Sequence, residues 1–447
     1  MAKLHNTLKR EINFFQALMT VIGTVIGAGV FFKISSITAQ TGSTSATIFV
    51  WILAGIISIT SGLTVSELAT AMPVTGGPTK YIEYTYGKTM GFLFGWAQML
   101  IYFPASIAAL SIVFATQFTV LFDIKAGYIT LIAIILALFL TMMNFFGTKF
   151  SSHMHTVISV IKVVPIILII LFGIFNTNKI NLSLWPITVG PGKSFTRGIS
   201  GALLSAMFAY DGWINFTNLA GEVKRPEKNL PRAIIIGLGV ITLIYVLVNY
   251  TFMSVSPLNT LVNNPSAAFD SSIRIFGGIG GKIITIGILL SVYGAVNGYI
   301  MTGMRVPYTM ARDNLLPFSK SIARLNVNTG VPVISELVIL ALSIIMMFLG
   351  TFDLLTDMLV FVMWAFTTLI SIAVFVLRKR EPDLERPYKV LLYPIIPVIS
   401  ILGGLFIVGS TLINQFWLSV VGIGITLIGL PIYYLHQKHV TKSPIKM

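Results

Sequence analysis

Long apolar stretches recur along the whole of this 447-residue sequence, and charged residues are almost confined to the gaps between them. Most stretches are long enough to cross the roughly 30 Å hydrocarbon core of a bilayer as helices, which satisfy their own backbone hydrogen bonds there. Charged residues make up 10% of the chain, against about 25% in soluble domains, and the mean hydropathy is +0.88. The sequence therefore predicts an all-α polytopic protein of the lipid bilayer.

Polar gaps and gaps rich in glycine and proline divide the chain into about twelve spans, and no gap is long enough for a soluble domain. Most lysines and arginines lie in gaps on the same side as the N terminus, which predicts a cell-membrane protein with both termini in the cytoplasm. The same bias explains the net charge of +15 without nucleic-acid binding. The expected spans are 12–40, 45–71, 90–121, 128–147, 155–175, 196–220, 233–255, 281–311, 332–350, 355–377, 391–412 and 416–435.

The first span contains an unusual glycine cluster, GTVIGAGVFF, at residues 23–32. Gly23 and Gly27 form a GxxxG pair, which commonly allows two helices to pack closely. The Gly27-Ala28-Gly29 triplet exceeds what such a groove requires, because each interior glycine costs a helix about 1 kcal/mol relative to alanine. We therefore expect the helix to be interrupted at this triplet, with close packing retained as the interpretation of Gly23.

A second helix-weakening pair, Asp211-Gly212, lies in the sixth span within SAMFAYDGWINFTNLAGE. Transporters built from inverted repeats often carry interrupted helices at matching positions of their two halves. Five spans separate the two features, so the single domain 1–447 is expected to contain repeats at 12–176 and 196–377, followed by two helices at 391–435. This is a five-plus-five inverted repeat with discontinuous helices 1 and 6.

Two interrupted helices offer opposite partial charges to a ligand. A second half-helix that begins near Gly27 presents free N–H groups and a positive dipole end, which suit a carboxylate. First half-helices that end near Ile26 and Ala209 expose carbonyl oxygens, which suit an ammonium group or a cation. An anion site beside a cation site describes a zwitterionic α-amino acid, and its expected binding residues are Val25, Ile26, Gly27, Ala28, Gly29, Phe208 and Ala209.

Three residues near these breaks carry more than one interpretation. Asp211 either contacts the substrate or caps the local backbone as a hinge. Phe208 is positioned to close over a bound side chain as a gate. Lys162, the lone charge of span 5, is expensive to bury and is expected to have a task. It either tethers neighbouring spans, stands where a sodium-coupled relative would hold Na⁺, or carries a proton.

Other polar residues within the spans are possible lining residues, although each is also typical of packing between helices. These are Trp213, Tyr245, Asn249 and Asn297. His153 and His155 have no second set of ligands, so no metal site is expected. The sequence lacks GxSxG, HExxH, Walker A and paired carboxylates, which argues against an enzyme, and no cofactor is expected.

Several motifs together resemble one known family. They are IGAGVF in span 1, FAYDGW followed by GEVKRPEKNLPRA after span 6, and SVYGAVNGYIMTGMRVPYTMARDNLLP through span 8. The chain resembles the amino acid–polyamine–organocation superfamily, and more closely the L-type amino acid transporter family with its bacterial serine/threonine and alanine/serine/cysteine exchangers. It departs from the family pattern at Thr79, where a tyrosine is usual.

The resemblance implies the five-plus-five fold and sodium-independent exchange of amino acids. It implies that Gly27, Ala28 and Gly29 hold the carboxylate. It also implies that the amino group is held by backbone oxygens, which belong to Val25, Ile26, Phe208, Ala209 and Asp211. Lys162 matches the family's lysine in span 5. Animal members form a disulfide with a heavy subunit; this chain has no cysteine, so a stand-alone bacterial transporter is expected.

The leading hypothesis is an antiporter that moves small neutral L-amino acids such as alanine, serine, threonine and cysteine by alternating access. Phe208 as a closing aromatic and the lack of a fixed side-chain counter-ion beyond Asp211 favour such substrates. A proton-coupled symporter, with Lys162 titrating, is the alternative. A channel fits less well, because it would need a continuous polar stripe along several spans.

Overall fold

The computed structural model describes residues 10–73, 76–145, 162–175, 180 and 182–442, whose regular elements are helices joined by loops, with one isolated parallel bridge between Ile12 and Val223. Within these residues, eight continuous helical segments are long and apolar enough to cross a membrane, and a bent pair of helices makes a ninth. The three other expected spans contain shorter helices: α9 (Val163–Ile174), α10 (Phe195–Ala209) and α17 (Val333–Leu349). The prediction of an all-α polytopic membrane protein is confirmed.

The chain forms two compact units, each assembled from separate parts of the sequence. Spans 1, 2, 6 and 7 lie in unit 1 with most of the described part of span 5, whereas spans 3, 4 and 9 lie in unit 2 with most of span 8. Spans that hold the same place in the two expected repeats therefore mostly share a unit. Unit 1 comprises Met1–Thr85, Val163–Ile288 and Met363–Phe416; unit 2 comprises Tyr86–Lys162, Leu289–Val362 and Trp417–Met447.

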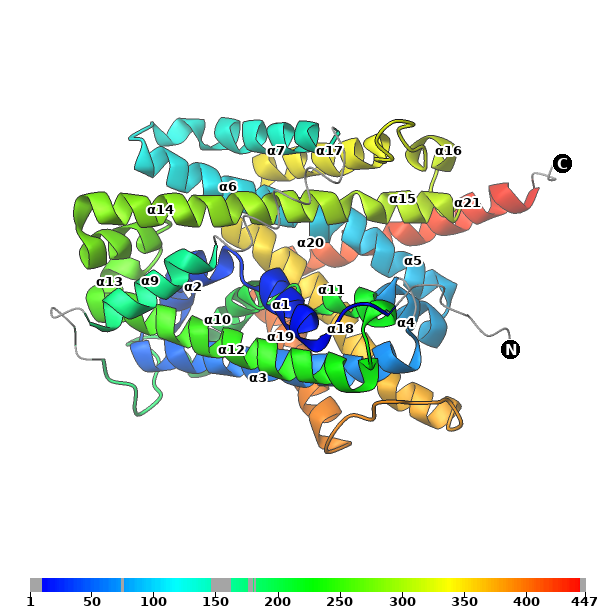
Figure 1. The fold of residues 1–447 in the computed structure, drawn as a ribbon, viewed down its shortest axis with the longest axis horizontal. Coiled ribbons are helices and arrows are strands. Elements are labelled where there is room, and N and C mark those ends of the chain that lie inside the picture. Colours follow the sequence, from blue (N-terminus) through cyan, green and yellow to red (C-terminus); the bar gives the residue numbers. More distant parts are fainter. Residues whose placement is uncertain (1–9, 74–75, 146–161, 176–179, 181, 443–447) are drawn as a thin grey trace. The chain divides into compact units, whose positions relative to one another are not determined.

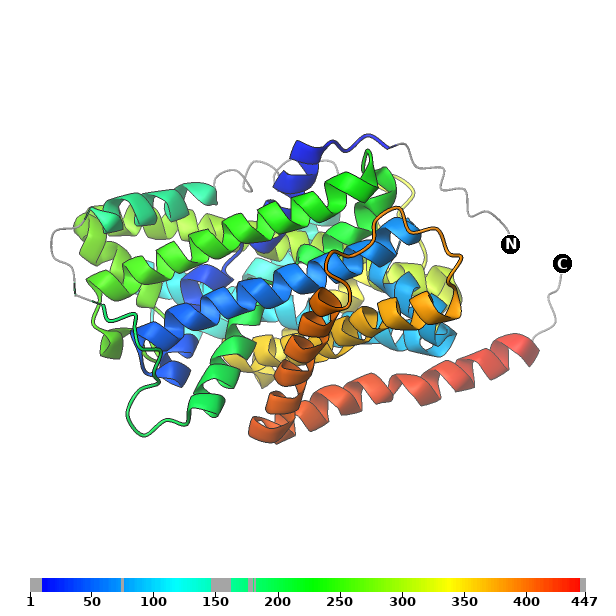
Figure 2. The ribbon, with the colours of Figure 1, turned by 90° about the horizontal axis from the view of Figure 1, so that it is seen from below.

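Unit 1 is built around two long helices, α3 (Thr44–Ala71) and α12 (Pro226–Val255), which run side by side in Figures 1 and 2. Gly55 permits their close approach, because a Cβ atom there would collide with the Thr242 side chain. The unit also contains α9, α10, α1 (Phe14–Val25), α2 (Gly29–Thr41), α4 (Gly77–Tyr86), α11 (Trp213–Phe216), η3 (Thr217–Glu222), α13 (Leu258–Leu261) and α19 (Ile395–Asn414).

Local sequence explains where the first helix of unit 1 begins. Asn13 and Gln16 form a capping box, in which each side chain accepts the other's backbone N–H at 2.9 Å. Just before this cap, the Ile12 N–H donates to the Glu222 carbonyl (3.0 Å) and the Ile12 carbonyl accepts from Lys224 (2.8 Å). The start of span 1 is thereby tied to the segment that follows span 6.

Unit 2 contains α17, α6 (Phe103–Leu121) and α7 (Ile129–Phe145), which pack together (Figure 1). Span 3 includes a π-helical turn, so it is not one uniform helix. Two helices, α14 (Ala267–Gly303), which is kinked at Gly277, and α18 (Phe352–Arg380), begin in one unit and end in the other. The remaining elements of unit 2 are α5 (Lys88–Ala97), η1 (Gln98–Tyr102), η2 (Ala126–Tyr128), α15 (Arg305–Arg312), α16 (Ser319–Ile322), α20 (Phe416–Leu427) and α21 (Gly429–Lys442).

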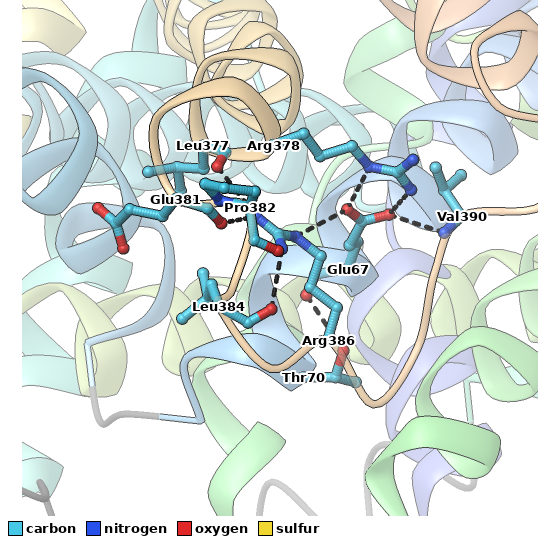
Figure 3. Close-up of polar contacts among 9 residues, drawn as sticks. All are labelled: Glu67, Thr70, Leu377, Arg378, Glu381, Pro382, Leu384, Arg386 and Val390. Atoms are coloured by element: carbon cyan, nitrogen blue, oxygen red, sulfur yellow. Dashed lines mark hydrogen bonds and ion pairs between the residues drawn. The ribbon is translucent and has the colours of Figure 1, made fainter.

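A buried carboxylate joins α3, the end of α18 and the following loop within unit 1 (Figure 3). Glu67, 1% exposed, receives two hydrogen bonds from Arg378, at 2.8 and 2.6 Å, and one from the Val390 N–H at 2.8 Å. Arg386 approaches the same carboxylate at 3.6 Å. The bidentate contact with Arg378 is the strong geometry for such a pair. The contact thus links residues of unit 1 that lie more than 300 positions apart in the sequence.

Candidate functional site

Span 1 is interrupted at the glycine triplet. Helix α1 ends at Val25, Ile26 is extended (φ −66°, ψ 108°), and α2 begins at Gly29 after a bend of 48°. Among the described residues, no hydrogen bond is recorded for the backbone N–H of Gly27, Ala28 or Gly29. The predicted break is confirmed, and three amide donors lie at the start of α2.

Span 6 is interrupted at the predicted Asp211-Gly212 pair. Helix α10 ends at Ala209, and Gly212 adopts a φ of +105°, which L side chains rarely adopt. The Asp211 N–H donates to the Phe208 carbonyl at 3.3 Å, so that carbonyl already accepts a bond within the turn. The second half of the span is one α-helical turn followed by a 3₁₀ helix, and it supplies no long helix dipole.

The two breaks pack directly against each other within unit 1. A Cβ atom on Gly212 would lie 2.6 Å from the Thr24 carbonyl oxygen, and one on Gly29 would lie 2.5 Å from the Ala209 Cα. Gly29 is therefore required for the close packing of α2 against the end of α10. Gly23, to which the sequence assigned a packing role, differs, because a Cβ there would meet no described atom within 4 Å. The glycine that packs closely against a neighbouring helix is therefore Gly29, against the end of α10, and not Gly23 six residues earlier.

Tyr245 joins the ends of the two first half-helices. Its hydroxyl lies 3.1 Å from the Val25 carbonyl oxygen and 2.9 Å from the Ala209 carbonyl oxygen. The two carbonyls assigned to the substrate's amino group therefore lie within reach of a single hydroxyl. Tyr245 is fully buried on α12, where its ring packs edge-on against Trp51 and Tyr210. Its hydroxyl therefore holds these two carbonyl groups close together.

The aromatic ring of Phe208 lies beside a buried cation. The Lys33 Nζ is 5.6 Å from the centroid of that ring, within cation–π range, and Lys33 is fully buried on α2. Phe208 itself is 7% exposed on the last turn of α10. The sequence singled out Phe208 but gave Lys33 no role; the signal was a lone charge one helical turn beyond Gly29.

The other predicted lining residues divide between the two units. Trp213 begins α11 and is buried beside the second break, and Asn249 lies one turn from Tyr245 on α12, donating to the Tyr245 carbonyl at 2.8 Å. Asn297 lies in unit 2, where its side-chain oxygen accepts from Asn144 at 3.2 Å. The structure thus gathers Trp213 and Asn249 with the breaks in unit 1, and within unit 2 it shows Asn297 linked to Asn144 of α7.

Lys162 is buried, 7% exposed, just before α9 and belongs to unit 2. His153 and His155 lie outside the described residues. In the described part of the chain, no three His, Asp or Glu side chains are grouped in a way that could hold a metal ion. The arrangement that remains is a backbone site, with unbonded amides from α2 next to paired carbonyls from α1 and α10.

Comparison with known proteins agrees with this geometry. Residues 12–436 match the family described as Amino acid permease. The chain belongs to this family. It also belongs with the L-type amino acid transporters of the amino acid–polyamine–organocation superfamily, as the sequence motifs predicted.

Three relatives illustrate the range of this permease's similarity. It is 38% identical to the serine/threonine exchanger SteT of Bacillus subtilis (strain 168), across 97% of this chain and 98% of SteT. It is 30% identical to the human cystine/glutamate transporter, across 96% and 85% of the two chains. It is 29% identical to the mouse large neutral amino acids transporter small subunit 2, across 96% and 81%. The relatives are amino acid transporters, and the chain is an amino acid transporter of the same family.

Proposed function

We propose that the protein exchanges small neutral L-amino acids across the cell membrane, independently of sodium, by alternating access. The observation that carries the proposal is the pair of opposite backbone sites in unit 1. The amides of Gly27 to Gly29 would hold the carboxylate, and the carbonyls of Val25 and Ala209, spaced by Tyr245, would hold the amino group. Phe208 would close over the side chain. Ile26 and Asp211 complete the proposed site.

The substrate range follows from what the site offers. Backbone amides and carbonyls recognise the part common to all α-amino acids, so selectivity falls to the side-chain pocket. The name of the Bacillus relative, a serine/threonine exchanger, supports small hydroxylated substrates. We place serine and threonine first, followed by alanine and cysteine.

The proposed topology rests on the distribution of spans and charges. Matching spans of the two expected repeats, 12–176 and 196–377, fall mostly in the same compact units, which supports the inverted repeat. The excess of Lys and Arg on one side supports cytoplasmic termini. The chain has no cysteine, so no heavy subunit can be attached to it by a disulfide.

We propose that Lys162 acts as a fixed cation, either as a tether or in the place of a sodium ion. Lys162→Ala should lower the maximal exchange rate under saturating internal substrate, because a fixed buried charge would be lost. Lys282→Ala, which removes an exposed lysine, is the control and should exchange like the wild type. Unchanged turnover and affinity in Lys162→Ala would remove Lys162 from the mechanism.

The deciding experiment is efflux from proteoliposomes loaded with radiolabelled serine. Each of the twenty amino acids is added outside in turn, with and without sodium and at two pH values. An exchanger releases label only when a substrate is present outside, and release is independent of sodium. Release into buffer without amino acid, or uptake driven by a pH gradient into empty vesicles, would favour the proton-coupled alternative instead.

A further inference from the structure

Unit 2 contains a buried acid that the exchange mechanism does not use. Glu336 lies in the first turn of α17 and is 1% exposed. Neither of its carboxyl oxygens makes a hydrogen bond of normal geometry within the described chain, although the Asn144 side chain lies close enough to act as a donor to the carboxyl group. An ionisable side chain inside a membrane protein normally has a function, because burial of its charge is costly.

The polar groups that the structure describes next to Glu336 are an amide and a hydroxyl group. α7 packs against α17, and its Asn144 side chain lies next to the carboxyl group while donating to Asn297 at 3.2 Å. Thr141, one turn from Asn144, has a buried hydroxyl with no partner among the described residues. Amide and hydroxyl groups can exchange hydrogen bonds with a neutral carboxyl, which both donates and accepts.

No ion pair with Glu336 is found in the described part of the chain. Among the elements packed against α17, α6 and α7 carry no ionisable side chain and η1 carries only Tyr102. The cations of α15 and α16 are all exposed, and none lies within ion-pair distance of the buried carboxyl. The ionisable residues of these two helices are Arg305, Tyr308, Arg312 and Lys320.

Two opposing effects act on the charge of this acid. A position in the first turn of a helix favours a carboxylate by about 0.3–2 kcal/mol. Burial of an ion without a partner costs several kcal/mol even after relaxation. The larger effect favours the neutral group. Ser335 donates to the Ile322 carbonyl at 2.9 Å, which ties this turn to α16 and keeps Glu336 inside.

We propose that Glu336 is a proton-binding site within unit 2, occupied in this conformation. Loss of the proton places an unpaired charge between α7 and α17, so water must enter or the two helices must separate. Exchange therefore slows as the pH rises through the titration of Glu336. This site differs from Lys162, for which the sequence left proton carrying open as one of three interpretations.

The test compares the pH profile of serine exchange in the wild type and in E336Q, from pH 5 to pH 9. Glutamine has the shape of the protonated acid but cannot lose a proton, so E336Q should keep its low-pH exchange rate across the range. S343A removes a buried hydroxyl from the same helix, which among the described residues donates to the Ile339 carbonyl alone, and should retain the wild-type profile. A flat wild-type profile, or the wild-type decline in E336Q, would overturn the proposal.

A second measurement does not depend on transport. The infrared spectrum of purified protein at neutral pH should contain the band of a protonated carboxyl group, which shifts in E336D and is missing in E336Q. The same band in E336Q would overturn the proposal. If E336Q does not fold, E336D provides the test, because a shorter acid should shift both the band and the pH of the decline. Failure of exchange in every variant with the infrared result intact would count against the exchanger alone.

Discussion

Removal of one hydroxyl group should loosen the candidate site without changing its shape. Tyr245→Phe deletes the group that lies within hydrogen-bond distance of both the Val25 and the Ala209 carbonyl. The hydroxyl has one proton, so its removal costs about one hydrogen bond shared between the two carbonyls, or about 1 kcal/mol. If all of this loss fell on substrate binding, the affinity would fall about fivefold. Since part of it lowers stability instead, we expect about threefold weaker binding and a lower melting temperature.

The assay is equilibrium binding of radiolabelled serine to purified protein, with a thermal melt of the same samples. Tyr210→Phe is the matched control, because its hydroxyl donates to the Trp51 carbonyl at 2.9 Å in the same aromatic cluster. The control should lose a similar amount of stability per bond and keep its affinity. Wild-type or tighter binding by Tyr245→Phe would refute the argument, because the spacing of the two carbonyls would then not matter to the substrate.

Three further substitutions test structural contacts within unit 1. Glu67→Gln should destabilise the protein by about 3–5 kcal/mol in a denaturant melt, since it leaves two arginines facing a neutral amide (Figure 3). Tyr84→Phe should cost less than about 1 kcal/mol, because its hydroxyl bond to Glu381 (2.6 Å) is exposed. That bond raises the pKa of Tyr84, so its contribution is present below the ordinary value near 10 and disappears as the pH rises through the raised one. Gly212→Ala should yield little folded protein on gel filtration, because of its positive φ and the nearby Thr24 carbonyl.

The positions of both helix breaks could be predicted from the sequence, because their causes are local. Glycine weakens a helix wherever it stands, and an Asp-Gly pair adds a residue that accepts a positive φ. The structure places the breaks at Gly27 and at Gly212, as expected. The unbonded amides that follow the first break arise from the break itself and were predictable with it, whereas the two carbonyls accept from the buried Tyr245 hydroxyl.

The partners of these groups could not be predicted, because they come from distant parts of the chain. Tyr245 lies 220 positions from Val25, and hydropathy cannot show which side of α12 meets a broken helix. The same holds for Lys33, visible as a lone charge but without its partner Phe208. It also holds for Gly29, whose contact with Ala209 depends on the packing of α2 on α10. Hydropathy periodicity and helix propensity describe one helix at a time, whereas these contacts depend on how the helices pack against one another.

The contact of Gly29 also changes how the carboxylate site should be tested. A larger residue at Gly29 would collide with the Ala209 backbone, so loss of transport there would not separate packing from binding. Gly27 separates them, because a Cβ at that position would have only the Val25 carbonyl within 4 Å, at 3.8 Å. Gly27→Ala should melt like the wild type yet bind serine about tenfold more weakly, since a methyl group that crowds a bound ligand costs about 1–3 kcal/mol. Gly23→Ala, which also has open space, should keep both properties. Full affinity in Gly27→Ala would mean that the substrate carboxylate does not lie against this amide.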